Sequence, residues 1–425
     1  MSPQQQQLVP ISIADLEHNA HTTMALNALD YYRSGANDMQ TLRDNQEAYN
    51  RLRLRPRILR DVSKVDTQTT LLGHTVASPI CISPTAMQRL ANDDGEKATA
   101  RAAAKAKKCM ILSSWSTTSA EDTIAAGKEI PVNHDTPGLP LYWFQLYVYK
   151  DRVATEQLIR RVEKAGYKAL VITVDTPFLG RRLADVRNVF KLPKHMSMAN
   201  FETKDSKVTM ATILDRENPD EGAAEELLQG VDDAKNPSSE AKRAAAGNGT
   251  KVVRQESSLA AYVVSQIDPT LNWKDIEWVR SISKLPVVVK GVLTAEDAKL
   301  AADAGVEGIM VSNHGGRQLD GVLATIDALP EVLDAVKGRN VEVYIDGGVR
   351  KGTDVLKALA LGAKAVFLGR PILWGLAHDG ENGVTLALDL VQKEFELAMA
   401  LAGCCKLSDI TRDYVQHGTV SRSRL

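Results

Sequence analysis

The sequence predicts an α/β protein whose core is a (β/α)8 barrel, also called a TIM barrel. Eight short, almost wholly apolar segments occur along the chain, and they alternate with amphipathic segments of helix length. Such apolar runs are typical of parallel strands that helices cover on both faces. The 425 residues are enough for one such barrel with additions. The main alternative is an open, doubly wound sheet.

The segments between the strands have the end signals of helices. The patterns EKATARAAAKAKK, RVATEQLIRRVEKAG, TAEDAKLAADAG and KGTDVLKALALGA lie between strands, and several begin at Thr or Asp and stop at Gly. Those residue types cap helices at these two ends. The predicted strands, in chain order, cover residues 79–83, 109–114, 142–148, 168–175, 286–290, 307–313, 341–346 and 364–369.

Polar side chains stand at the carboxyl end of nearly every predicted strand. In a (β/α)8 barrel these ends share one face, which is where enzymes with this fold place their active sites. Any one such residue is more simply a polar loop residue, but their recurrence predicts an active-site rim. The strand-end residues are Ser113, Gln145, Tyr147, Thr173, Asp175, Lys290, His314, Asp346 and Arg370.

Two segments depart from the alternation of strands and helices. Residues 1–78 precede the first barrel strand and are expected to be a helical extension, with a basic stripe at 51–60 that is most simply a solvated or inter-subunit face. Residues 191–255 follow the fourth strand and are rich in charged and small residues. Insertions of this length are typical of active-site lids or disordered segments. We expect one domain covering residues 1–425.

The composition argues against several classes of protein. With 52 basic and 53 acidic residues, the chain is not expected to bind nucleic acid or an anionic membrane generally. No apolar run approaches the roughly 20 residues that span a bilayer. The four cysteines form no zinc motif or disulfide framework, so we expect no metal site and a reducing compartment.

The two ends of the chain bear on its location. The first residues, MSPQQQQLVP, lack the basic and apolar regions of a signal peptide. The last three residues, Ser423, Arg424 and Leu425, resemble the Ser-Lys-Leu peroxisomal address, although an arbitrary polar tail is an equal alternative. A peroxisomal or cytoplasmic location is therefore expected.

Nine ordered motifs resemble those of the FMN-dependent 2-hydroxy-acid oxidase family: YYRSGANDMQTLRDN, PTAMQ, LSSWS, FQLYVYKDR, TVDTPFLGRRLADVRN, VVKGVLTAEDA, VSNHGGRQLD, DGGVRKGTDVLKALALGA and FLGRP. The match runs from about residue 10 to the C-terminus and is interrupted mainly at 131–141 and 191–255. The resemblance implies a (β/α)8 barrel, an FMN cofactor, a small 2-hydroxy acid and O2 as reactants, and a homo-oligomer, either a tetramer or an octamer.

The resemblance assigns three residues to the substrate carboxylate. Arg182 and Arg317 match the family's two carboxylate-binding arginines, and Tyr31 matches a third donor. Arginine suits this task because its planar fork can hold a carboxylate through two hydrogen bonds. An alternative for Arg182 is a surface or helix-start arginine, which is the simpler interpretation of its neighbour Arg181.

The resemblance also assigns the catalytic residues. His314 matches the family's catalytic base, Asp175 the carboxylate that pairs with it, and Tyr147 a hydrogen-bond partner of the substrate hydroxyl. An imidazole suits a base because it is largely neutral near pH 7 and can hold a proton during turnover. A lone histidine after a strand is more often structural, but its companions on the same rim favour catalysis.

For the cofactor, Lys290 matches the lysine near N1 of the flavin ring, where a cation stabilises the reduced, anionic form. The phosphate is expected at the glycine-rich turns after strands seven and eight, where barrels of this kind bind phosphate. A buried lysine paired with an acid is the alternative for Lys290, but no partner is identifiable. The remaining FMN-binding residues implied are Pro84, Thr85, Ala86, Ser113, Gln145, Thr173, Ser312, Asp346, Gly347, Gly348, Arg350, Gly369 and Arg370.

Trp115, in LSSWS, resembles members in which an indole lines the substrate side-chain pocket, so small acids such as glycolate and L-lactate are expected. No His-Pro-Gly-Gly heme segment occurs in the first 78 residues, which argues against a fused heme as electron acceptor. Four alternatives remain open: a dehydrogenase with another acceptor, a lactate 2-monooxygenase, a flavin-free aldolase that uses Lys290 as its Schiff base, and a barrel that only binds or scaffolds.

Overall fold

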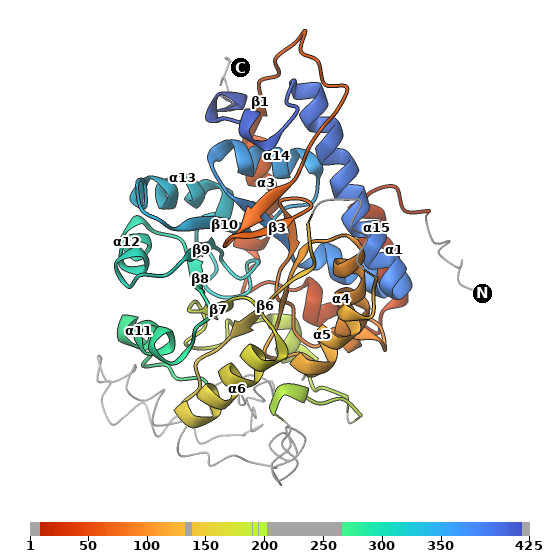
Figure 1. Cartoon of the computed structure of the whole chain (residues 1–425). Helices are drawn as coiled ribbons and strands as arrows, with labels where there is room; N and C mark the ends of the chain where they lie inside the picture. Colours follow the sequence, from red (N-terminus) through yellow and green to blue (C-terminus); the bar gives the residue numbers. More distant parts are fainter. Residues whose placement is uncertain (1–8, 132–137, 189, 194, 202–265, 419–425) are drawn as a thin grey trace, which may run out of the picture.

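The computed structural model describes residues 9–131, 138–188, 190–193, 195–201 and 266–418. Its centre is a closed barrel of eight strands that run in chain order from β4 to β11. All neighbouring strands are parallel, and β11 pairs with β4 to close the barrel. Helices surround these strands, with α11, α12 and α13 along one side in Figure 1. The predicted (β/α)8 barrel is confirmed, and the open sheet is excluded because no barrel strand is left as an edge.

Each of the eight predicted strands corresponds to one barrel strand. Their residues are almost all buried, as expected for strands covered on both faces. The strands are β4 (Ile80–Ile82), β5 (Cys109–Leu112), β6 (Leu141–Leu146), β7 (Leu170–Thr173), β8 (Val287–Val292), β9 (Gly308–Val311), β10 (Glu342–Asp346) and β11 (Ala365–Leu368).

The predicted caps occur at several of the outer helices. The Asp151 carboxylate accepts a hydrogen bond from the first turn of α6, and Gly166 ends that helix in the left-handed conformation. Thr294 caps α12 in the same way as Asp151. The helices are α4 (Gly95–Lys105), α5 (Ala120–Lys128), α6 (Arg152–Ala165), α7 (Leu183–Arg187), α11 (Trp273–Ile282), α12 (Ala295–Asp303), α13 (Thr325–Ala335), α14 (Gly352–Leu361) and α15 (Arg370–Ala402).

The segment before the barrel is helical only as far as residue 51, so the expectation of a helical extension over residues 1–78 is wrong for residues 52–78. Three helices, α1 (Ile13–Thr23), α2 (Leu26–Arg33) and α3 (Gln40–Arg51), are followed by three short strands. The basic stripe runs from the last residue of α3 into β1 (Leu52–Leu54), which pairs with β12 (Val415–His417). Leu52 is buried and Arg53 exposed, the alternation of a strand with one covered face.

The end of the barrel at which the strands begin is filled with side chains. A hairpin of β2 (Thr69–Leu71) and β3 (His74–Val76) contributes Leu71 and Val76 to a cluster with Trp143, Tyr344 and Phe367 inside the barrel. Large apolar groups fill this end of the barrel, and open space lies at the other end, where the strands finish.

Two sequence-based expectations fall mainly on residues outside this description. Of the expected lid at 191–255, the structure describes only 191–193 and 195–201, so the lid remains a prediction. Residues 419–425, which include the C-terminal tripeptide, are not described either. Among the described helices, none has the length and apolarity of a bilayer span.

Candidate active site

A pocket opens at the carboxyl ends of the barrel strands, as the rim residues predict. Asp175 and Ser312 are the only predicted site residues outside its lining, and each contacts a residue that lines it. The pocket therefore brings together residues from α2 and from the ends of all eight strands. Its predicted lining residues are Tyr31, Pro84, Thr85, Ala86, Ser113, Trp115, Gln145, Tyr147, Thr173, Arg182, Lys290, His314, Arg317, Asp346, Gly347, Gly348, Arg350, Gly369 and Arg370.

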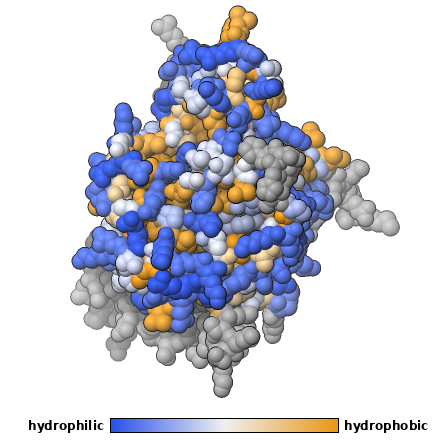
Figure 2. Space-filling view, viewed as in Figure 1, coloured by the Kyte–Doolittle hydropathy of each residue, from blue (hydrophilic) through white to orange (hydrophobic). Residues whose placement is uncertain are grey.

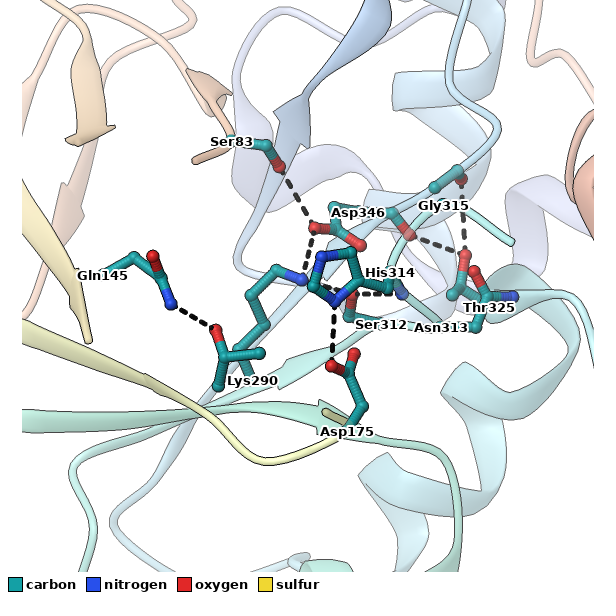
Figure 3. A network of polar contacts seen from close by, with 12 residues as sticks. Ser83, Gln145, Asp175, Lys290, Ser312, Asn313, His314, Gly315, Thr325 and Asp346 are labelled. Carbon is teal, nitrogen blue, oxygen red and sulfur yellow. Dashed lines mark hydrogen bonds and ion pairs between the residues drawn. The ribbon is translucent and has the colours of Figure 1, made fainter. Parts of the chain in front are cut away.

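His314 stands on the turn that follows β9 and is held by Asp175, which follows β7. The Nδ1 atom of His314 lies 2.8 Å from Oδ1 of Asp175, as Figure 3 shows. Because a carboxylate only accepts, this contact places a hydrogen on Nδ1 and leaves Nε2 with its lone pair. His314 itself has a φ of 57°, an unusual value for a residue with a side chain. Asp175 thus fixes the orientation of the His314 imidazole.

The two glycines after His314 allow this turn to pack tightly. Gly316 has a φ of 74°, and a Cβ there would lie 2.6 Å from the backbone nitrogen of Leu42 in α3. The Asn313 side chain secures the turn to the same helix, because it exchanges two 2.8 Å hydrogen bonds with the side chain of Asn45. The glycine-rich turn therefore docks on α3 and fixes the position of His314.

Burial, aided by the nearby charges of Lys290 and Arg182, favours the neutral form of His314. Burial lowers its pKa below the ordinary value of 6.5, and the nearby charge of Asp175 opposes this only in part. For Asp175, burial raises the pKa, but the charge and hydrogen bond of His314 outweigh it and lower the pKa to about 2. An ionised carboxylate behind a neutral imidazole is the arrangement that a proton acceptor needs.

Two arginines of the site are anchored by the C-terminal end of α2. Arg317 donates from Nη1 to the carbonyls of Tyr31, at 2.6 Å, and Ser34, at 3.0 Å. Arg370 donates to the carbonyls of Tyr32, Ser34 and Gly315 at 2.8 to 2.9 Å. The carbonyl end of a helix carries partial negative charge, which stabilises nearby cations. The N-terminal segment thus orientates both guanidinium groups.

The pocket has an excess of buried positive charge. Burial, and then the charges of Arg317 and Arg350, lower the pKa of Arg370 well below its ordinary value. Burial and the neighbouring Arg182 lower the pKa of Arg317 to about 10. Arg350 has a buried Nε atom with no hydrogen-bond partner among the described residues. These observations fit two anionic groups, such as the phosphate of FMN and a substrate carboxylate.

Arg182 has one acidic neighbour. Its side chain is buried, and Nη1 lies 3.6 Å from Oδ2 of Asp185, while its Nε has no hydrogen-bond partner within the described chain. The surface alternative for Arg182 therefore fails, although Arg182 does stand at a helix start, as the N-cap residue of α7. Arg181 is exposed, as expected. A buried guanidinium with an unused donor at the pocket wall suits carboxylate binding.

Lys290, in the carboxyl-terminal half of β8, has the acidic partner that the sequence did not reveal. Its Nζ lies 3.5 Å from Oδ2 of Asp346 and donates to Ser312 Oγ at 2.9 Å. Ser83 donates to the same carboxylate oxygen of Asp346 at 3.1 Å. Lys290 is therefore paired with an acid (Figure 3) and is also part of the pocket wall. Asp346 orientates Lys290 from the end of β10.

A set of amides and hydroxyls lines the side of the pocket formed by β5, β6 and β7. The Gln145 amide donates to Thr173 Oγ1 at 3.1 Å and accepts from the backbone of Ser114 at 3.1 Å. Ser113 approaches the same amide oxygen at 3.4 Å. Fixed donors and acceptors of this kind suit the edge of a heteroaromatic ring such as that of a flavin.

Aromatic rings form the remaining wall. The rings of Trp115 and Tyr147 lie 4.6 Å apart between centroids, and Arg317 lies 4.8 Å from the centre of the Tyr31 ring. Burial, and then the charge of Asp175, raise the pKa of Tyr147. Its phenol group therefore remains protonated and available as a hydrogen-bond donor.

Several lining residues were missed by the sequence interpretation. Ser83 ends the first predicted strand, so the strand-end rule that identified the other rim residues would have found it. The apolar residues have no distinguishing pattern, since any barrel strand or helix start contains similar ones. The missed residues are Tyr32, Ser83, Gly315, Val349, Phe367, Leu368 and Leu373.

Comparison with known proteins shows which family the chain resembles. A family model described as FMN-dependent dehydrogenase matches residues 20–417. The chain is 48% identical to 2-hydroxyacid oxidase 1 of Homo sapiens over 98% of this chain and 99% of that one. It is 50% identical to glycolate oxidase 1 of Oryza sativa over 91% and 90%. A crystal structure of mandelate oxidase, 36% identical, aligns with a TM-score of 0.79 and covers 97% of this chain and 100% of that one.

Proposed function

Because the chain belongs to the FMN-dependent dehydrogenase family, we propose that it oxidises small (S)-2-hydroxy acids, such as L-lactate and glycolate, to 2-oxo acids. In the proposed reaction the 2-hydroxy acid and O2 give the 2-oxo acid and hydrogen peroxide. The observation that carries this proposal is the position of His314, a neutral base backed by Asp175, in the same pocket as several buried arginines. The oxidase names of the relatives support O2 as the acceptor.

FMN, when bound, accepts the two electrons that the substrate loses. The chain supplies the groups that would hold it. The glycines and Arg350 and Arg370 at the ends of β10 and β11 suit its phosphate, and Gln145 and Thr173 suit the ring edge. Lys290 places a cation at the pocket wall, where it would stabilise negative charge on the reduced ring.

The substrate would be held by its two polar ends. Arg317 and Arg182 bind the carboxylate, with Tyr31 as a further donor, and Tyr147 contacts the hydroxyl. His314 takes a proton at Nε2, and Asp175 stabilises the resulting imidazolium. Because Asp175 is already ionised and in contact with Nδ1, the imidazole need not reorientate when it gains the proton.

Two alternatives within the class differ in the fate of the electrons. A dehydrogenase would pass them to another acceptor, and a lactate 2-monooxygenase would release acetate and carbon dioxide in place of pyruvate and peroxide. The flavin-free aldolase alternative is disfavoured, because a Schiff base needs an uncharged amine and Lys290 is paired with Asp346. The family match also favours a flavin.

The proposal is tested by flavin reduction and oxygen uptake. The purified protein is mixed anaerobically with glycolate, L-lactate, D-lactate and (S)-mandelate, and the flavin absorbance is followed. Air is then admitted, and oxygen consumed, peroxide and carboxylic acid products are quantified. We expect reduction by the small (S)-acids and one peroxide per oxygen. No reduction by any acid contradicts the function, and acetate from lactate identifies a monooxygenase.

We further infer that the protein is a homo-oligomer, a tetramer or octamer. An exposed apolar surface supports this inference: Ile58 is 79% exposed, Leu59 100% and Leu401 70%. Ile58 and Leu59 belong to the loop that follows β1. In this loop the backbone nitrogen of Arg57 donates to the carbonyl of Ala402, so the loop lies beside the end of α15. Figure 2 shows apolar side chains at the tip of this loop, at the top of the view. Light scattering of Ile58→Ser with Leu59→Ser should give a smaller species than the natural chain.

A peroxisomal location would fit a peroxide-forming reaction, and Ser423–Leu425 support it as a candidate address. A fluorescent fusion at the N-terminus is expected to enter peroxisomes, and removal of the last three residues to leave it in the cytoplasm. An unchanged location would contradict the address.

A further inference from the structure

Trp115 in the pocket wall has a hydrogen-bond partner behind it. The indole Nε1 of Trp115 donates to the hydroxyl of Tyr149 at 3.1 Å. Trp115 lines the pocket, whereas Tyr149 lies behind it and is buried. An indole has a single donor, so this contact selects one orientation of a large flat ring.

Tyr149 is itself firmly placed at the connection between β6 and α6. Its backbone nitrogen donates to Thr155 Oγ1 at 3.1 Å, and its carbonyl accepts from Arg152 Nη1 at 2.7 Å. Its ring lies 5.1 Å from that of Phe201. With backbone and ring both fixed, the hydroxyl is a stationary acceptor for the indole.

The same hydroxyl connects the wall to the side of the pocket assigned to the flavin ring. It donates to Ser114 Oγ at 3.5 Å, and Ser114 in turn donates to the Gln145 amide oxygen at 3.3 Å. Tyr149 thus accepts from the substrate-side wall and donates toward the cofactor side. These hydrogen bonds link Trp115 to the flavin side of the pocket, which is the same whichever substrate binds.

We propose that Tyr149 is a positioning residue that sets the substrate size limit by fixing the indole of Trp115. The inference rests on the proposed function, since it assigns the substrate class of that site. With the indole fixed, the space beside the substrate's C2 accepts a hydrogen or methyl substituent and excludes a phenyl ring. If the indole loses its acceptor, it can turn aside and admit a larger group.

The test is the Tyr149→Phe holoenzyme, assayed with glycolate and (S)-mandelate. The ratio of kcat/KM for mandelate to that for glycolate is expected to rise about three- to tenfold, as the loss of one neutral hydrogen bond allows. Most of the change should appear in KM for mandelate, while glycolate turnover changes less than about twofold. Flavin content should equal that of the natural enzyme.

Two comparisons separate positioning from general loosening. Tyr167→Phe removes another buried tyrosine hydroxyl, which donates to the Ala120 carbonyl at 2.9 Å outside the pocket lining, and should leave the ratio unchanged. In a Trp115→Phe background the indole donor is absent, so adding Tyr149→Phe should cause no further change. Non-additivity of this kind identifies coupled residues.

A binding readout keeps the inference testable without turnover. Perturbation of the flavin absorbance gives Kd for oxalate and for benzoylformate, a small and a large acid. Tyr149→Phe should tighten benzoylformate relative to oxalate by the same three- to tenfold. The inference is overturned if Tyr149→Phe changes neither the kcat/KM ratio nor the Kd ratio. It is also overturned if Tyr149→Phe changes them equally in the Trp115→Phe background. If the natural enzyme does not oxidise glycolate but Tyr149→Phe still shifts the Kd ratio, only the proposed function is contradicted.

Discussion

Lys290, within β8, and Asp346, at the end of β10, form a buried ion pair with 3.5 Å between Nζ and Oδ2. Both side chains line the pocket, so the cation assigned to the flavin ring is also a structural partner of a carboxylate. Removing one member of a buried pair costs about 3–5 kcal/mol, because the other charge stays buried and unpaired.

This pair gives a prediction that separates stability from catalysis. Lys290→Met is expected to lower the free energy of unfolding by about 3 kcal/mol and to slow flavin reduction by substrate. Adding Asp346→Asn should restore much of the stability, since no lone carboxylate remains, while flavin reduction stays slow. Urea unfolding and anaerobic stopped-flow measurements check the two effects. Fast reduction in the double variant would contradict the role of Lys290.

His314→Gln is expected to abolish turnover while FMN stays bound. Glutamine keeps a polar side chain of similar reach but cannot take a proton, and a positioned base contributes roughly 10²–10⁴ in rate. We expect kcat to fall by at least about 10² with unchanged flavin absorbance. Activity near that of the natural enzyme would refute His314 as the base.

The pH dependence follows from the lowered pKa of His314. Only the neutral imidazole accepts a proton, so kcat/KM should be constant near neutral pH and fall as the pH drops through the pKa of His314, below 6.5. Rate measurements from about pH 4.5 to about pH 8 bracket the ordinary histidine range and locate this limb. A limb above 6.5 would contradict the assignment.

Asp175→Asn tests the charge behind the imidazole. Asp175 raises the pKa of His314, so its neutralisation should move the acid limb to lower pH. It should also lower kcat, because the imidazolium loses its counter-charge. Thr176→Val is a matched control, since Thr176 Oγ1 contacts both Asp175 and His314 without carrying charge. A limb that stays in place in Asp175→Asn would argue against coupling of the pair.

Arg317→Lys tests carboxylate binding. Lysine keeps the charge but cannot reach the Tyr31 and Ser34 carbonyls while offering a planar fork to the substrate. KM for glycolate is expected to rise at least about tenfold, a loss of roughly 1.4 kcal/mol. Arg181→Lys, at an exposed neighbour of the site, is the control and should leave KM unchanged.

The sequence was sufficient for the barrel and for most of the rim. All eight strands were found because buried parallel strands read as apolar runs, and their polar ends marked the site. The helical expectation for residues 52–78 failed at its start because β1 is stabilised by pairing with the distant strand β12, in which His417 lies opposite Leu52. Short strands of this kind depend on distant partners, which a local pattern does not contain.

What the sequence alone determined is therefore the chemistry available: a base, its carboxylate, several arginines and a lysine, most of them at or after the carboxyl end of a predicted strand. Only the tertiary structure decided which of them meet. It showed that Asp346 pairs with Lys290, that the carbonyls of α2 hold Arg317 and Arg370, and that Tyr149 holds Trp115. These contacts join residues far apart along the chain, and closure of the barrel is what brings their strand ends onto one face.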